Sequence, residues 1–398
     1  MMRKTLLFAI TFLLIAAFGF SETYTEEPFL PLNPEFMAMG GAFVAASHGY
    51  NALFFNPAGF AADGGSLTLA STTVWVHSRP DAVYEIAQSL NTDAVDESAL
   101  MTQILGVVND QVTTGGFGAG ASAGIGLVGG GLGLGLVAMV DSYFWGPTIL
   151  GVSGYATATV AFVGGLAIPF DLLGIKFTVG GDVRPMVRIH APLNNSEALS
   201  LVNTIIGGDM DKALTDIQQL DAMHGVGIGL DAGATAKLGP LTFALTARDI
   251  GGTTFAYTDS TVGQIYTSLS DDGTLPDGSE NTDTYVIPMD ICGGVSFHPD
   301  LGGLRFLIDP MVSVDCQDII DVIQEGESPW KLLHAGAEVK LLSLFSARAG
   351  LNQGYLTAGA GVKLLFLDAN FAVYTRELGT NIGDKPCSGM SFEFAIRF

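Results

Sequence analysis

The sequence predicts a 14-stranded antiparallel transmembrane β-barrel with an N-terminal hatch and some helix in its outer loops. Three observations lead to this fold. First, only 14% of the 398 residues are charged whereas 48% are hydrophobic, so the chain differs from a soluble protein with about 25% charged residues. Second, apolar and polar residues alternate in many short segments, which is the period of a β-strand. Third, tight turns and long loops alternate between these segments, as in outer-membrane barrels.

The charge and hydrophobicity of the chain argue against a nucleic-acid-binding protein and against an intrinsically disordered one. The chain contains 40 acidic and 17 basic residues, and its formal net charge is -23. Such acidity disfavours nucleic acid as a partner, because phosphate binding needs a basic face. Intrinsic disorder is excluded as well, because disordered chains combine high net charge with low hydrophobicity. Much of the acidity falls in stretches predicted as outer loops, such as 81–110, 209–221 and 271–283.

The first residues have the pattern of a signal peptide. Arg3 and Lys4 precede an uncharged apolar run that extends to Phe20, and small residues follow near Ser21. We therefore expect residues 1–21 to be removed on export. The three cysteines are odd in number and scattered, which argues against a disulfide framework or a cysteine metal site.

The strands are predicted from alternation along the chain. Near the end, Phe392 and Phe394 alternate with Glu393 and Ala395, and the earlier segments repeat this pattern. The predicted strands span 66–79, 116–128, 131–145, 149–168, 175–190, 224–238, 241–258, 284–298, 304–317, 331–342, 345–353, 355–365, 367–378 and 387–398. An aromatic girdle at the long-loop end is expected from Trp75, Trp145, Trp330, Tyr257, Tyr285 and Tyr355. The terminal Phe398 has the form of an outer-membrane assembly signal.

A short region before the first strand carries a resemblance to a known family. It contains Gly40-Gly41-Ala42, followed by Asn56-Pro57-Ala58. Pro57 favours an extended Asn56, whose side chain can bond its own backbone in a tight turn. The region resembles the hatch of the long-chain fatty-acid outer-membrane transporter (FadL-type) family, and the C-terminal part is similar to its divergent spirochaete members. The resemblance implies a hatch over residues 22–63 and a barrel over 64–398, in the bacterial outer membrane.

The same resemblance implies a function. Family members carry hydrophobic compounds passively, most notably long-chain fatty acids, which are captured by outer loops and released through the barrel wall into the membrane lipid. In this sequence the loop after the fifth strand has apolar residues at helical spacing, which we expect to form a capture groove: Leu199, Val202, Ile205, Leu214 and Ile217.

A fatty-acid carboxylate in an apolar lumen needs a cation or hydrogen-bond donors. Arg184, Arg188 and Arg248 lie on the inward parity of their strands and are the candidate contacts. The alternative for each is structural pairing with an inward carboxylate such as Asp182, Asp231 or Glu338.

Other functions are disfavoured. The run Gly124-Ile-Gly126-Leu-Val-Gly129 matches a dinucleotide fingerprint, but it lies in a predicted strand with no helix after it. No cofactor or metal is expected, and the six histidines have no ligand spacing. An enzyme such as a membrane phospholipase is disfavoured because no Ser/His/acid set can be placed. The main alternative to transport is a barrel of the same fold that binds a secreted protein through its outer loops.

Overall fold

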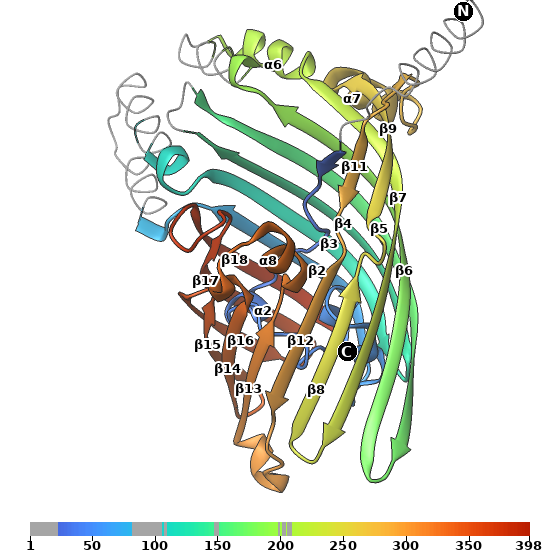
Figure 1. The fold of residues 1–398 in the computed structure, drawn as a ribbon, viewed down its shortest axis with the longest axis vertical. Coiled ribbons are helices and arrows are strands. Elements are labelled where there is room, and N and C mark those ends of the chain that lie inside the picture. Colours follow the sequence, from blue (N-terminus) through green and yellow to red (C-terminus); the bar gives the residue numbers. More distant parts are fainter. Residues whose placement is uncertain are drawn as a thin grey trace, which may run out of the picture.

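The computed structural model describes residues 23–81, 106, 110–146, 151–197, 200, 204 and 209–398. Long strands dominate these ranges (Figure 1). The wall strands are β2 (Ser66–His77), β3 (Phe117–Gly129), β4 (Leu132–Trp145), β5 (Ser153–Leu172), β6 (Ile175–Leu193), β7 (Asp221–Leu238), β8 (Leu241–Arg248), β9 (Thr253–Thr261), β11 (Thr284–Ile287), β12 (Asp290–Phe297), β13 (Ile308–Cys316), β14 (Leu333–Leu341), β15 (Phe345–Asn352), β16 (Tyr355–Leu364), β17 (Leu367–Glu377) and β18 (Pro386–Arg397).

These strands close into one antiparallel barrel. β18 pairs with β2 and thereby joins the two ends of the sheet. β8 and β9 form two halves of one wall strand, since β7 pairs with both, and β11 and β12 form two halves of the next. The wall therefore has fourteen strands, which confirms the predicted fold class and the predicted strand positions.

The joint between β8 and β9 interrupts the wall. Asp249, Gly251 and Gly252 adopt positive φ angles of 49°, 81° and 82°. Glycine tolerates this conformation without steric cost, whereas Asp249 is held in it by hydrogen bonds described below. The strand facing this joint is broken as well, between Ile287 and Asp290.

The wall is uneven in height. β5 has 20 residues and β6 has 19, whereas β15 has only 8. Figure 1 shows the tall strands reaching above and below the short ones. The tight turns lie at one end and the long connections with α6 (Met210–Gln218) and α7 (Val262–Asp271) at the other, which marks the latter as the outer end.

The barrel exterior is apolar. On β4, Leu134, Leu136 and Val140 are exposed, while Gly135, Val137 and Met139 between them are buried. On β18, Phe392 and Phe394 are exposed and Glu393 is buried. An apolar outer face around a polar or small-residue interior is the arrangement of a transmembrane barrel of the outer-membrane type. Among the described residues, no helix is long and apolar enough to span a membrane.

The predicted aromatic girdle is only partly correct. Trp145, at the end of β4, and Trp330, on η5 (Pro329–Leu332), are exposed to solvent or lipid. Trp75 and Tyr257 are instead 3% and 2% exposed and face the lumen, because each lies on the inward parity of its strand. Position near a strand end therefore did not predict on which side of the wall an aromatic side chain lies.

The lumen is filled by the N-terminal segment. β1 (Thr23–Thr25) lies at the outer end beside β11, and the chain then runs inside the barrel through α2 (Pro34–Met37), η1 (Gly49–Leu53) and η2 (Pro57–Ala61) to the periplasmic end (Figure 1). We call residues 26–63 the hatch. Its aromatic rings form the largest buried cluster, which includes Phe29, Phe36, Phe43, Phe54, Phe55 and Phe60. Apolar burial of this kind holds the hatch inside the wall.

Candidate functional site

The two hatch motifs named from the sequence are close-packed turns. Asn56 begins η2: its Oδ1 accepts a hydrogen bond from the Ala58 amide at 3.0 Å, and its Nδ2 donates to the Val44 carbonyl at 3.3 Å. A Cβ on Gly233 of the wall would lie 1.9 Å from Asn56 Oδ1. Wall glycines therefore make room for the Asn56-Pro57-Ala58 turn.

The Gly40-Gly41-Ala42 motif lies against the opposite side of the barrel. Gly40 and Gly41 have φ angles of 67° and 83°, and a Cβ on Gly40 would lie 2.4 Å from the Leu351 carbonyl oxygen. Both the backbone conformation and the close approach require glycine. Ala42 is fully buried.

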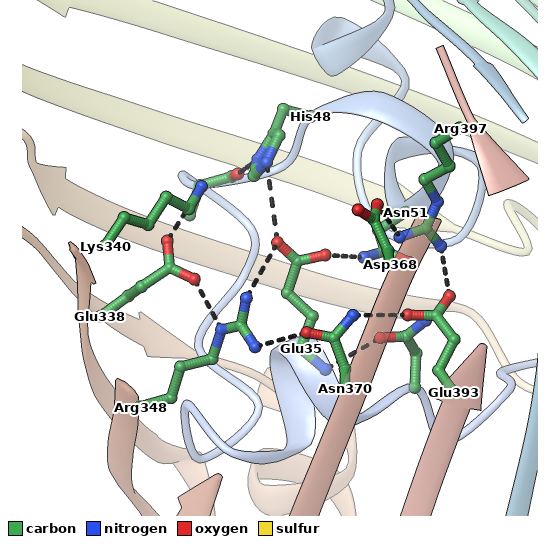
Figure 2. Close-up of polar contacts among 12 residues, drawn as sticks. Glu35, His48, Asn51, Glu338, Lys340, Arg348, Asp368, Asn370, Glu393 and Arg397 are labelled. Carbon is green, nitrogen blue, oxygen red and sulfur yellow. Dashed lines mark hydrogen bonds and ion pairs between the residues drawn. The ribbon is translucent and has the colours of Figure 1, made fainter. Parts of the chain in front are cut away.

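A charged network connects the hatch to the short side of the wall (Figure 2). Glu35 of α2 accepts a hydrogen bond from Asn51 Nδ2 at 2.6 Å, and its other oxygen lies 3.8 Å from both His48 and Arg348. Burial raises the pKa of Glu35, but Arg348, His48 and other cations outweigh it and lower the pKa to about 2. Glu35 is therefore an anion at neutral pH.

The wall side of this network spans four strands. Arg348 Nε donates to Glu338 at 2.6 Å, and Arg348 Nη1 donates to Asn370 at 2.9 Å. Asn370 donates in turn to Glu393, which pairs with Arg397 (Figure 2). Buried charges with several partners of this kind are costly to break, so the network fixes the position of α2.

Two cavities open beneath the hatch. One, of about 980 Å³, lies between η2 and the periplasmic ends of β6 to β8 and β13, and its lining includes Lys176, Lys237 and Arg305. The other, of about 480 Å³, lies under Glu35 and Tyr50. Acidic and basic side chains contribute to both linings, whereas the aromatic residues of the hatch form an apolar cluster above them.

All three arginines predicted as carboxylate contacts face the lumen, and each has a carboxylate partner. Arg184 donates to Asp231 and to Asp249, both at 2.8 Å. Arg188 donates to Glu26 of the hatch at 2.8 Å, and Arg248 pairs with Asp290. The alternative role of these arginines, structural pairing with inward carboxylates, is therefore present in the structure. Asp231, one of the predicted carboxylates, pairs with Arg184.

A small cavity of about 50 Å³, which we call the outer-lumen cavity, lies between the first residues of the hatch and the wall. Leu30, Leu32, Trp75 and Met139 line it together with cationic Arg188 and Arg376, while Glu27 and Asp141 supply its acidic edge. Arg376 pairs with no carboxylate among the described residues, and its buried Nε has no hydrogen-bond partner there. Arg376 is absent from the site predicted from the sequence, although it shares the inward parity of Tyr374 and Ala372 on β17.

The predicted capture groove is described only in part. Leu199, Val202 and Ile205 lie outside the described residues. Leu214 and Ile217 lie on α6, where they are 58% and 39% exposed. α6 packs beside α7, whose Tyr266 and Leu269 are exposed as well. We call Leu214, Ile217, Tyr266 and Leu269 the outer apolar patch.

Comparison with known proteins finds similar barrels among solved structures only. No protein family and no curated protein matches the chain. The toluene transporter TodX of Pseudomonas putida is 11% identical, with 94% of this chain and 99% of that chain covered and a TM-score of 0.45. The CymD monoaromatic hydrocarbon channel is 12% identical over 92% and 96%, with a TM-score of 0.47. A FadL homologue of Pseudomonas aeruginosa is 10% identical over 93% and 99%, with a TM-score of 0.43.

Proposed function

We propose that this barrel is a passive outer-membrane channel for hydrophobic compounds, with long-chain fatty acids as its ligands. The observation that carries the proposal is the apolar filling of the lumen: an aromatic hatch occupies the space that a porin leaves to water. Polar solutes have no wet path through such a cluster, whereas an apolar chain gains free energy by contact with it.

Entry would begin at the outer apolar patch. Its four side chains stand exposed on two helices above the barrel mouth, where they can remove an apolar chain from water. The outer-lumen cavity lies deeper, between the hatch and β2, β4 and β17. An acyl chain would follow the apolar side of this cavity along Leu30, Leu32 and Met139.

The ligand carboxylate would be held by Arg188 and Arg376, which line that cavity. Arg376 is the stronger candidate because it forms no salt bridge among the described residues and its Nε has no hydrogen-bond partner there, and a buried guanidinium favours an anionic partner. Arg184 and Arg248 remain predictions from the sequence, but each lies in an ion pair outside the lining of this cavity.

Release would occur through the wall between β11 and β13. β12 pairs with β13 only from Gly293 onward, so the edge of β11 is left without a wall partner among the described strands. β1 occupies this edge instead: Thr23, Tyr24 and Thr25 pair in parallel with Thr284, Tyr285 and Val286. A three-residue strand holds an edge far more weakly than a full barrel strand, so this is the part of the wall that can open locally.

A reversible disulfide tests the release route. Tyr24 and Tyr285 are direct register partners, and strand neighbours lie about 4.8 Å apart, within reach of a disulfide. The Tyr24→Cys/Tyr285→Cys pair, in a Cys316→Ser background, should lower uptake of pyrene-labelled palmitate when oxidised and restore it on reduction. The matched control is Ser279→Cys/Asp259→Cys, which links β10 (Ser279–Glu280) to β9 by a disulfide and leaves the β1–β11 pairing free.

The outcomes separate the parts of the proposal. Equal uptake by the oxidised and reduced β1–β11 pair would remove this edge as the exit while leaving transport in place. Absence of palmitate uptake by the unmodified barrel, in cells where it is folded in the outer membrane, would overturn the transport function itself.

A further inference from the structure

A cysteine, a histidine and an aspartate from three distant parts of the chain form a line in the outer lumen. Cys387 Sγ lies 3.6 Å from His77 Nδ1, and His77 Nε2 lies 3.1 Å from Asp141 Oδ1. Cys387 and His77 are both fully buried. Each ring nitrogen of His77 thus has one partner, a thiol on one side and a carboxylate on the other.

The glycine-rich strand β3 allows this arrangement. His77 ends β2, Cys387 begins β18 and Asp141 lies on β4, so β3 separates the histidine from the aspartate. On β3 the residues that face His77 and Asp141 are Gly118 and Gly120, which have no side chains. The side chains of β2 can therefore cross β3 and reach Asp141.

The geometry is that of an activated nucleophile. A nucleophile within reach of a base, with the base oriented by a third group, is the arrangement that generates reactive thiolates. Asp141 also accepts a hydrogen bond from Trp75 Nε1 at 2.7 Å, which fixes its carboxylate. In this arrangement the thiol proton can reside on His77, whose imidazolium is stabilised by Asp141.

The surrounding charges act on the same thiol. Arg376 contacts Cys387 and pairs with no carboxylate among the described residues. The other titratable groups that face the cluster are Lys385, Tyr143, Tyr155, Tyr374 and Glu27. Two cations and His77 therefore surround one thiol, with Asp141 and Glu27 as the nearby carboxylates.

We propose that Cys387 is a covalent modification site for small α,β-unsaturated carbonyl compounds that enter the outer lumen. The thiolate attacks the β-carbon and forms a C–S bond, while the π electrons of the C=C bond move to the carbonyl as an enolate. The enolate then takes the proton held by the His77 imidazolium at its α-carbon, so His77 ends neutral. No oxidant or further reactant is needed.

The proposal requires a reagent to approach the buried thiol from the outer-lumen cavity, which adjoins the cluster. Asp141 and Arg376, which flank the cluster, also line that cavity. The other two cysteines provide internal comparisons. Cys316 is exposed and has no basic partner among the described residues, and Cys292 is buried with its Sγ 2.9 Å from the carboxylate of Asp290.

Alkylation of single-cysteine proteins tests the proposal. Three variants, each retaining only Cys387, Cys316 or Cys292, are folded in detergent and treated with N-ethylmaleimide, and adducts are quantified by mass spectrometry. Between about pH 6 and 8 the rate at Cys387 should change less than about threefold, whereas the rate at an unperturbed thiol rises about tenfold per pH unit below its pKa. Cys292 should stay unmodified in the folded protein.

His77→Gln should restore an ordinary pH slope at Cys387, with folding checked by heat-modifiable migration on gels. Asp141→Asn should have the same direction of effect. If His77→Gln does not fold, the pH profile of the protein retaining Cys387 decides alone. A Cys387 that is alkylated only after unfolding, or one whose rate rises with pH as steeply as that of Cys316, would overturn the proposal.

Discussion

Trp75 on β2 donates a hydrogen bond to Asp141 on β4, with its Nε1 2.7 Å from Oδ1, by passing over Gly120 of the strand between them. A Cβ on Gly120 would lie 2.2 Å from the indole ring. Glycine at this position of β3 therefore lets the large inward side chain of Trp75 lie across the sheet.

We expect Gly120→Ala to displace Trp75 and destabilise the barrel by about 1–3 kcal/mol, the usual range for overpacking. Gly293→Ala on β12 is the matched control, because the nearest atoms to its Cβ would be 3.8 Å away. The loss of the compact band on heated gels measures the difference. Equal thermal stability of the two variants would contradict the role assigned to Gly120.

Arg184 holds two buried carboxylates. Its partners Asp231 and Asp249 are almost fully buried, and Asp249 sits in the left-handed turn between β8 and β9. Removing the guanidinium leaves both charges unpaired, so Arg184→Gln should cost about 3–5 kcal/mol. Arg305→Gln, which breaks the exposed pair with Asp309, should cost less than about 1 kcal/mol.

Urea unfolding of the two arginine variants measures these costs. Fatty-acid affinity measured on the folded fraction of Arg184→Gln addresses its other predicted role. An unchanged affinity would remove Arg184 from the carboxylate contacts, while a stability loss no larger than that of Arg305→Gln would contradict its structural role.

Glu35 is expected to make the folding stability of the barrel depend on pH in the acidic range. Its pKa in the folded protein is lowered from 4.5 to about 2, so the ionised form is stabilised by folding. This contribution is fully present above about pH 4.5 and is lost as the pH falls through about 2, with a magnitude of about 3 kcal/mol. The protein with Glu35→Gln should lack this part of the acid sensitivity, as urea unfolding between pH 2 and 5 would show. Parallel stability curves for the two proteins would refute the assignment.

Arg376 is expected to discriminate anionic from neutral ligands. Arg376→Gln should weaken palmitate binding by about tenfold, since one charge-assisted contact contributes about 1.5 kcal/mol or more. Binding of the neutral hexadecanol should not change. Arg305→Gln, which changes an exposed arginine outside the outer-lumen cavity, serves as the control. Equal losses for the acid and the alcohol would point to a structural effect.

The outer apolar patch is expected to set the rate of capture. Replacing Leu214 and Ile217 with Ser removes exposed apolar surface and should lower the rate of palmitate uptake at limiting concentration, with less effect at saturation. Thr215→Ser/Gln218→Ser changes polar positions on the same helix and should have no effect. An unchanged rate in the Leu214/Ile217 variant would exclude α6 from the capture groove.

Most of the barrel could be predicted because its pattern is local. The alternation of apolar and polar residues predicted the positions of the fourteen strands. It also predicted that Arg184 and Arg188 face the lumen, as they do. The same rule predicts that Trp75 faces inward, whereas its position near the end of β2 suggested a place in the aromatic girdle.

Contacts between distant segments could not be predicted in this way. Cys387 and His77 are 310 positions apart, and nothing in either neighbourhood specifies the other. The same holds for β1, whose pairing with β11 depends on where β13 stops. Only Gly251 and Gly252 gave a local sign that the wall is broken after β8.

The uneven wall has a consequence for the surrounding bilayer. Eight residues of β15 extend roughly 26 Å along the strand, and at a tilt of about 40° they span roughly 20 Å of membrane, less than the usual apolar band of about 25 Å. Lipids beside β14 to β16 must thin to match it, at a cost of fractions of a kcal/mol per Å. The lipid headgroups therefore lie closer to the bilayer centre on the side of the barrel next to β13. A molecule that leaves the lumen beside β11 would cross less of the apolar layer before it reaches these headgroups than at other places around the wall.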